Sequence, residues 1–292
     1  MLALNHRTVG PFFPYPTEAS PAAIWALRRV LQSYVGPIVR ISRSPDDAER
    51  DFYSVAGGQL NLAEITNFVN VGDGTGRVRT FYDQTGNGHH AVQPIPSSQA
   101  ALVTGGTTFT TFNGRLIINC VSNQFYYTPT DPLGSNFGEP GGNTSDMTVV
   151  ALTETVMGRG TDEFGTTPYG WSWQWHIQST NAQFVVLVGV SPAAYTLTVT
   201  PTAGMVKRTY TLNQTPGVNS VAAYKENGVQ LSTDTYGNWA LRGMGTGFWF
   251  QIGRINTFPV NGRFAEAHVF TSVLNSAQEA QILQAMSAIY GV

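Results

Sequence analysis

The chain has 292 residues with 18 acidic and 16 basic side chains, so its formal net charge is −2. This length allows one large β domain or two ordinary domains, with a core that needs no metal or disulfide. Hydrophobic residues make up 42% of the chain and charged residues 12%, which excludes a disordered chain. The near-neutral balance, without a Lys/Arg run, argues against nucleic acid as the main partner.

Cysteine content and targeting signals narrow the class of protein further. The single Cys120 has no partner for an internal disulfide, and with five scattered His residues it cannot form a standard zinc cage. Cys120 lies in an apolar run, so we expect a buried, inert thiol. Residues 1–20 lack the features of a signal peptide, and no run approaches 18 consecutive apolar residues. We therefore expect a soluble protein, made in a cytosol, with no cofactor, no metal and no membrane insertion.

Residues 1–19 are predicted to form an extended arm ahead of a single domain over residues 20–292. Three prolines between Pro11 and Pro16 forbid a helix and favour a polyproline-like conformation. Two interpretations are open: the arm straps across its own domain, or it docks into a neighbouring subunit. In either case the arm would bury three aromatic side chains: Phe12, Phe13 and Tyr15.

The segment after the arm has the pattern of a helix. Ser20-Pro21 is a typical start, with Ser as the cap and Pro at the first helical position. Gly36-Pro37 is a typical stop. Between them, apolar residues recur at helical spacing: Ile24, Leu27, Leu31 and Tyr34. We therefore predict a helix here, followed by a strand over Ile38–Ser42.

Two further helices have capping signals. Asn61 and Glu64 resemble a capping box, with Leu60 and Ile65 placed as a hydrophobic staple across it. Near the end of the chain, Ser276 and Glu279 form a second capping-box pattern. We predict a short helix from Asn61 and a terminal helix from about Ser276, whose apolar face is Ile282, Leu283, Met286 and Ile289.

From Thr80 onward, short apolar runs alternate with clusters of Gly, Asn, Pro and Thr, which is typical of strands and turns. Asn227-Gly228 is the strongest hairpin signal, and Asn113-Gly114 is a second one. Many short strands without alternating helices predict an antiparallel β-sandwich or jelly roll. The expected strands include Met147–Leu152, Phe184–Val190, Tyr195–Thr200, Ser220–Tyr224, Phe248–Ile252 and Glu266–Phe270.

The stretch Thr80-Phe-Tyr-Asp-Gln-Thr-Gly-Asn-Gly-His-His-Ala-Val-Gln93 is distinctive. It resembles the Tyr-Asp-Gln-Ser-Gly-x-Gly-x-His element of the arabinofuranosidase B catalytic domain. The same combination occurs in laminin-G-like, concanavalin-like domains of bacteriophage virion proteins. The resemblance runs from about Ser20 to Gly291 and implies a concanavalin A-like β-sandwich. From its residues alone the motif is a turn, in which Asp83 accepts hydrogen bonds; a metal site at His89-His90 is the alternative.

The resemblance does not extend to the catalytic residues of the arabinofuranosidases. In that family the general acid follows an Ile-Gly-Gly-Asp-Asn element, whereas here Arg254 or Ile255 takes the place of the acid. The family's nucleophile lies in a Cys-Cys-Phe-Asp-Tyr-Gly-Asn-Ala-Glu element, which this chain lacks. A glycosidase needs two facing carboxylates, and the acidic doublet Asp162-Glu163 is interpreted as a solvated loop. We therefore expect no enzymatic activity.

The run Trp171-Ser-Trp-Gln-Trp-His176 is the best candidate for ligand binding. As a strand it places its three tryptophans on one face and Gln174 and His176 on the other. Two interpretations are open: the tryptophans belong to the core of the sandwich, or they form a platform for sugar rings. The predicted ligand-binding residues are Trp173, Gln174, His176, Arg254 and Asn256.

These observations predict a non-enzymatic structural protein of a bacteriophage virion, used in tail adsorption, as a fibre or in surface decoration. Its expected partners are other virion proteins, further copies of this chain and host surface glycans. Two alternatives are kept: an α-L-arabinofuranosidase-type glycoside hydrolase with relocated carboxylates, and a cellular carbohydrate-binding module.

Overall fold

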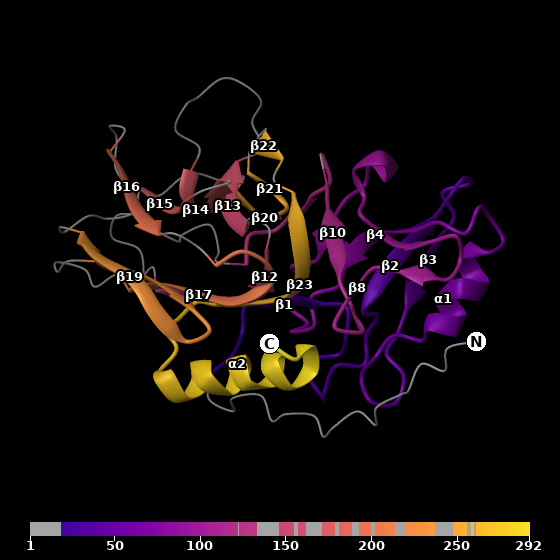
Figure 1. Ribbon diagram of the computed structural model, residues 1–292, viewed down its shortest axis with the longest axis horizontal. Coiled ribbons are helices and arrows are strands. Elements are labelled where there is room, and N and C mark those ends of the chain that lie inside the picture. The colour runs from indigo at the N-terminus through magenta and orange to yellow at the C-terminus, as the bar shows by residue number, and fades with distance from the viewer. Residues whose placement is uncertain are drawn as a thin grey trace.

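Two antiparallel β-sheets stack face to face, with a long helix against the outside of one of them (Figure 1). The computed structural model describes residues 19–121, 123–132, 146–154, 157–161, 171–178, 181–188, 193–199, 202–213, 220–236, 248–255, 258–259 and 261–292. Over 157–161, 171–178, 181–188 and 193–199, and at positions 220, 234, 236, 248, 249, 254, 255, 258 and 259, the backbone alone is described.

The first sheet is named here the β23 sheet, after its longest strand. In order it contains β1 (Ala23–Ala26), β23 (Gly262–Phe270), β12 (Met147–Thr153), β17 (Val206–Asn213), β18 (Ser220–Glu226) and β19 (Val229–Tyr236). A further strand, β10 (Ile118–Cys120), also pairs with β23. The expected strands near residues 147, 220 and 266 are confirmed in this sheet.

The second sheet is named the β4 sheet. In order it contains β16 (Ala193–Val199), β15 (Asn181–Val188), β14 (Trp171–Gln178), β13 (Met157–Thr161), β20 (Phe248–Ile252), β11 (Tyr126–Tyr127), β5 (Ala91–Val92), β4 (Gly76–Phe81), β2 (Val39–Arg43) and β3 (Glu49–Phe52). Strand β6 (Ala101–Thr104) pairs with β4 and carries β7 (Thr108–Phe109). Every strand pairing of the described residues is antiparallel, so the predicted antiparallel β-sandwich is confirmed.

A few short elements lie outside the two sheets. Two small hairpins lie outside them, β8 (Thr111–Phe112) with β9 (Arg115–Leu116) and β21 (Arg254–Ile255) with β22 (Phe258–Pro259). A 3-10 turn spans Pro96–Ser98. Within the described residues, no helix combines the length and the apolar character needed to cross a bilayer.

The apolar core lies between the two sheets. Phe81 of β4 is fully buried there, with its ring 5.0 Å from that of Tyr126 and 5.7 Å from that of Phe264. Trp25 of β1 packs against Phe250 of β20 at 5.0 Å between ring centroids, so the core also links the edge strand β1 to the opposite sheet. Each large apolar side chain buried in this way stabilises the fold by about 1.5–3 kcal/mol.

Helix α2 (Ser276–Tyr290) covers the outer face of the β23 sheet (Figure 1). Its buried residues Ile282, Leu283 and Met286 pack with Val150 and Phe270 of the sheet. The predicted start is confirmed, but the predicted capping pair is wrong. The cap is Asn275 and its capping-box partner is Gln278, because the side chain of Glu279 turns inward and is buried in an ion pair with Lys225 of β18.

Other local predictions are confirmed. Helix α1 (Leu62–Val69) is capped by Asn61, whose side chain accepts a hydrogen bond from the Glu64 amide at 3.3 Å. Asn227 and Gly228 both have positive φ, 51° and 81°, and join β18 to β19 in the backbone geometry that an Asn-Gly hairpin requires.

The predicted helix after Ser20-Pro21 is wrong. The first part of the segment forms strand β1, which pairs with β23 from Ala23 opposite Val269 to Ala26 opposite Glu266, and the rest up to Pro37 is irregular. All four residues of β1 are buried. An amphipathic helix needs a solvated face, and this segment is enclosed on both sides, so pairing with β23 outweighs the helical spacing of its apolar residues.

Candidate functional site

The Tyr82-Asp83-Gln84 motif crosses from the end of β4 to the open edge of β1 in the other sheet. Asp83 Oδ1 accepts a hydrogen bond from the Ile24 amide at 3.1 Å, and the Gln84 amide donates to the Ile24 carbonyl at 3.1 Å. The Gln84 side chain continues this pairing, since Oε1 accepts from the Val30 amide and Nε2 donates to the Arg28 carbonyl, both at 2.7 Å. The motif is therefore a clasp that fastens one sheet to the other.

The turn that follows the clasp is held by further hydrogen bonds to the Asp83 carboxylate. Its carboxylate also accepts hydrogen bonds from the amide and hydroxyl of Thr85 and from the His89 amide. Gly86 and Gly88 have φ of 86° and 83°, a conformation that side chains disfavour. The His89 carbonyl accepts from Trp25 Nε1 at 2.7 Å. These contacts confirm the turn interpretation of Asp83 and His89.

The histidine doublet makes separate contacts. His90 Nδ1 accepts a hydrogen bond from the Asp83 amide at 3.1 Å, and burial lowers the pKa of His90, which favours the neutral ring. His89 Nδ1 lies 3.0 Å from the Thr130 hydroxyl. Among the residues that the structure describes, no three His, Cys, Asp or Glu side chains lie close enough to hold a metal ion.

Cys120 is fully buried, and burial raises the pKa of its thiol to about 12. The predicted burial of Cys120 is confirmed, and a thiol with this pKa is protonated at neutral pH. Gly253 packs directly against it: with φ of 85°, a Cβ at this position would lie 2.9 Å from Cys120 Sγ.

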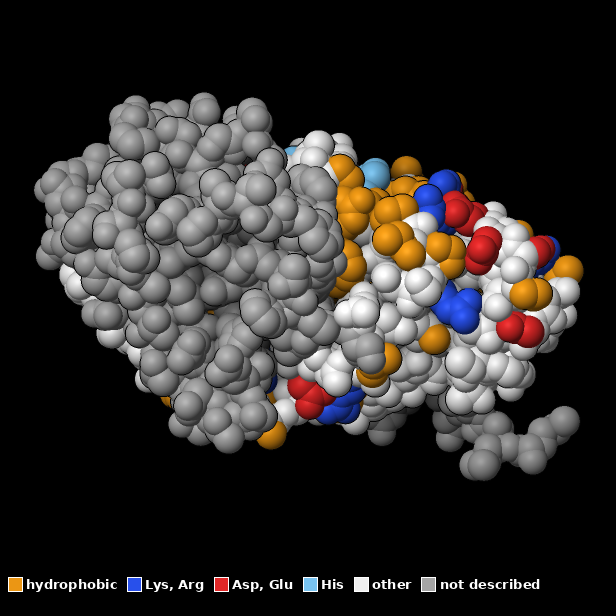
Figure 2. All heavy atoms as spheres, turned by 90° about the horizontal axis from the view of Figure 1, so that it is seen from above, with side chains coloured by type: hydrophobic (Ala, Val, Ile, Leu, Met, Phe, Trp, Pro, Cys, Tyr) orange, Lys and Arg blue, Asp and Glu red, His pale blue; other side chains and the backbone are white. Residues whose placement is uncertain are grey.

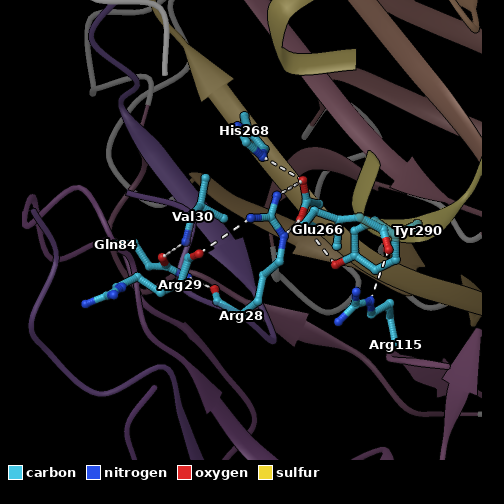
Figure 3. Close-up of polar contacts among 9 residues, drawn as sticks. Arg28, Arg29, Val30, Gln84, Arg115, Glu266, His268 and Tyr290 are labelled. Atoms are coloured by element: carbon cyan, nitrogen blue, oxygen red, sulfur yellow. Dashed lines mark hydrogen bonds and ion pairs between the residues drawn. The ribbon is translucent and has the colours of Figure 1, made fainter. Parts of the chain in front are cut away.

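A buried ionic cluster lies under the end of α2 (Figure 3). Arg28 and Glu266 form its centre, with His268 Nε2 3.3 Å from Glu266 Oε1 and the Tyr290 hydroxyl donating to Glu266 Oε2 at 3.2 Å. All four residues are buried. Burial alone would raise the pKa of Glu266, but the charge of Arg28 and the hydrogen bond from His268 outweigh it and lower the pKa to about 2. This enclosed, ionised carboxylate holds Arg28, His268 and Tyr290 together.

A row of side chains crosses the outer face of the β4 sheet. The strand registers place six residues side by side, named here the outer row: Asp51, Arg40, Thr80, Val92, Tyr127 and Gln251. Their neighbours along the strands, such as Val39, Phe81 and Tyr126, belong to the core. Because side chains alternate along a strand, the outer row faces away from the core. Thr80 and Gln251 are buried in it, whereas Asp51, Arg40, Val92 and Tyr127 are partly exposed.

Rings and hydroxyls extend the outer row on the same face. Tyr82 and His90 lie two residues from Thr80 and Val92, and their rings meet edge to face at 5.0 Å. The ring of Tyr127 lies 6.3 Å from that of Phe125. Figure 2 views the molecule from the side opposite α2 and shows hydrophobic side chains gathered beside acidic, basic and histidine side chains in the described part.

Four charged side chains of alternating sign lie at the β3 end of this face. They are named here the charge ladder: Asp51, Arg40, Glu49 and Arg79. Arg40 donates from Nε and Nη2 to the two carboxylate oxygens of Asp51 at 2.6 and 2.9 Å. Its Nη1 lies 3.7 Å from Glu49 Oε2, and Arg79 Nε lies 2.8 Å from Glu49 Oε1. Each of these side chains is 28–39% exposed, so the charge ladder is accessible to a ligand.

The chemistry of the charge ladder favours binding over proton transfer. The hydrogen bonds from Arg40 lower the pKa of Asp51 despite its partial burial, and the Tyr82 hydroxyl adds another at 2.7 Å. Burial and this hydrogen bond raise the pKa of Tyr82, so the hydroxyl remains a donor. A general acid needs a carboxyl with a raised pKa, and Asp51 is shifted in the opposite direction.

Three of the predicted ligand-binding residues, Trp173, Gln174 and His176, belong to β14, toward the other end of the same sheet. Gln174 pairs with Gly158, which pairs with Gln251, so its backbone continues the outer row. Trp173 pairs with Arg159, which pairs with the core residue Phe250. His176 and Arg254 are placed by their backbone in β14 and β21. The rest of the predicted site lies outside the described residues: Asn256, Phe12, Phe13 and Tyr15.

Sequence reasoning did not find the outer row or the charge ladder. The signal for one strand was present, because Val39-Arg-Ile-Ser-Arg43 alternates apolar and polar residues. The members of the charge ladder come from β2, β3 and β4, and only the strand registers bring them together.

The solved structures of two arabinofuranosidases are similar to this chain. One, complexed with arabinofuranosyl-alpha-1,2-xylobiose, gives a TM-score of 0.57 at 13% sequence identity, and a GH54 α-L-arabinofuranosidase soaked with a cyclic sulfate inhibitor gives 0.54 at 16%. The chain has the β-sandwich fold of these enzymes. In both cases the alignment covers 92% of this chain and 62% of the other. No protein-family model matches the sequence, and no curated protein matches it either.

Proposed function

We propose that this protein is a non-catalytic glycan-binding β-sandwich and that the outer face of the β4 sheet is its binding surface. The observation that carries the proposal is the outer row, where the Arg40–Asp51 pair and the Tyr82 hydroxyl lie on one face with the ring of Tyr127. Sugars are bound by flat rings that stack on their CH groups and by fixed polar side chains that orient their hydroxyls. This face offers both.

The absence of catalysis is part of the proposal. Retaining and inverting glycosidases use one carboxyl as a general acid and a second as nucleophile or base. On this face Asp51 and Glu49 are both held by arginines, and the lowered pKa of Asp51 keeps it ionised. In the resemblance to the arabinofuranosidases, Arg254 or Ile255 stands in the place of the acid.

Binding to immobilised oligosaccharides tests the proposal. We expect the protein to bind at least one glycan on an array, and Tyr127→Ala to weaken that binding by about tenfold, the size of one lost ring contact. Leu231→Ala is the matched control, because it removes an exposed apolar side chain from β19 of the other sheet. Absence of binding to every glycan, or an equal loss in both variants, would contradict the proposal.

A glycoside hydrolase of the arabinofuranosidase type is the second candidate, favoured by the shared β-sandwich fold. Incubation with an aryl arabinofuranoside separates the two. Turnover that disappears on replacing Asp162 or Glu163 would establish the hydrolase and replace the binding proposal.

We further propose that the protein works as part of a bacteriophage virion, with other virion proteins and copies of this chain as partners. The proposal is supported by the motif at Tyr82–His89, by the low content of charged residues and by the proline-rich arm. Deleting residues 2–16, which removes Phe12, Phe13 and Tyr15, should leave a folded protein that no longer co-sediments with phage particles. A truncated protein that still joins the particle would contradict it.

A further inference from the structure

The positive and negative side chains of the charge ladder neutralise one another. Arg40 is engaged by both carboxylate oxygens of Asp51, and Arg79 is engaged by Glu49. Two positive and two negative side chains therefore alternate on the candidate binding face and sum to zero. The neighbouring rings add no charge: burial lowers the pKa of His90, which disfavours the imidazolium, and raises the pKa of Tyr82, which disfavours the phenolate.

We infer that this face selects neutral saccharides over saccharides that carry a carboxylate, such as uronic or sialic acids. The inference rests on the proposed glycan-binding function and names the class of glycan. An acidic sugar is usually held by an arginine that presents two free N–H groups to its carboxylate. On the charge ladder, Asp51 already occupies the Nε and Nη2 groups of Arg40.

An acidic sugar would also meet repulsion. To reach Arg40 its carboxylate would have to approach Asp51 and Glu49, which lie two residues apart on the same strand and face the same side. The carboxylate of the sugar would be repelled by these two carboxylates, and their partial burial reduces the screening of that repulsion by water and salt.

Neutral hydroxyls fit the same groups. Asp51 Oδ1 accepts from Arg40 and Tyr82, whereas Oδ2 accepts from Arg40. A carboxylate oxygen can accept two hydrogen bonds, so Oδ2 retains capacity for a sugar hydroxyl. The Tyr82 hydroxyl and the Arg40 guanidinium hold this acceptor in place before a ligand arrives.

The first test compares neutral and acidic oligosaccharides on one glycan array. We expect neutral arabino-, xylo-, galacto- or gluco-oligosaccharides to bind, and their uronic- or sialic-acid-containing counterparts to bind at least about tenfold more weakly. Binding should change by no more than about twofold between roughly 50 and 500 mM NaCl, because no net charge is neutralised. Preference for acidic glycans would overturn the inference and leave the proposed function standing. Binding to no glycan would overturn the proposed function itself.

The second test frees the arginines. Asp51→Asn removes the charge that occupies Arg40, and Glu49→Gln does the same for Arg79, so each variant should gain at least about fivefold in binding to acidic oligosaccharides. Glu64→Gln is the matched control, because it frees Arg50 in an ion pair at α1. A melting curve verifies that each variant is folded, and Glu49→Gln decides the test if Asp51→Asn is not. An equal gain in the Glu64 variant, or no gain in a folded ladder variant, would overturn the inference.

Discussion

Arg28 and Glu266, which lie 238 positions apart in the sequence, form a buried ion pair with two contacts: Nε to Oε2 at 2.7 Å and Nη2 to Oε1 at 2.9 Å (Figure 3). The pair ties the segment after β1 to the middle of β23. Because the Tyr290 hydroxyl donates to the same carboxylate, the pair also anchors the end of α2. The carboxylate of Glu266 on β23 thus holds both the segment after β1 and the end of α2, which are distant from it in the sequence.

Glu266→Gln should destabilise the protein by about 3–5 kcal/mol, since the substitution leaves Arg28 buried without a counter-charge. Chemical denaturation measures the loss. Glu154→Gln is the control, because Glu154 also pairs with an arginine, Arg263, but both side chains are about one third exposed. That variant should lose about 1 kcal/mol or less, and equal losses in the two variants would contradict the assigned role.

Acid should weaken the fold through the same carboxyl. The pKa of Glu266 is lowered to about 2 in the folded protein from an ordinary value of 4.5. A lowered pKa stabilises the fold above the ordinary value, and this contribution is lost as the pH falls from 4.5 toward 2. Urea denaturation across that range should show a steep decline, with a shallower one in Glu266→Gln. Identical slopes would show that other groups control acid unfolding.

Gln84→Ala should open the clasp between the sheets. The substitution leaves the Val30 amide and the Arg28 carbonyl without the partners that Gln84 provides, which costs roughly 2–5 kcal/mol in unfolding free energy. Hydrogen exchange should accelerate first over residues 22–30. Asn87→Ala, which removes a hydrogen bond from an exposed side chain to the Ala22 carbonyl, should cost about 1 kcal/mol or less. Unchanged exchange over residues 22–30 would contradict the role of the clasp.

Trp173→Ala is predicted to lower the unfolding free energy by about 3–5 kcal/mol, as expected for a large aromatic core residue. The prediction follows from the register, which aligns Trp173 through Arg159 with the core residue Phe250. Gln174→Ala, one position along the strand, should leave the melting temperature nearly unchanged and weaken glycan binding. A binding defect in Trp173→Ala with an unchanged melt would mean that the faces of β14 are assigned the wrong way round.

Local sequence signals determine the elements that depend on local geometry. The Asn227-Gly228 turn and the cap of α1 at Asn61 each require a conformation or a hydrogen bond supplied by residues a few positions apart. The alternation of many short strands and turns likewise predicted the β-sandwich. The residues that form such a pattern also produce the local structure, so the pattern can be recognised without the tertiary structure.

Tertiary structure alone decided the features that depend on distant partners. The segment after Ser20-Pro21 has apolar residues at helical spacing, yet Ala23–Ala26 is a strand because β23 and the clasp at Asp83 and Gln84 supply hydrogen bonds along both of its edges. The candidate site has the same origin. In the sequence Arg40 is a polar residue that alternates with buried ones. Only the fold places it in the charge ladder with Asp51, Glu49 and Arg79. The sequence does not state the strand register, because register is set by how two complete sheets bury their inner faces against each other.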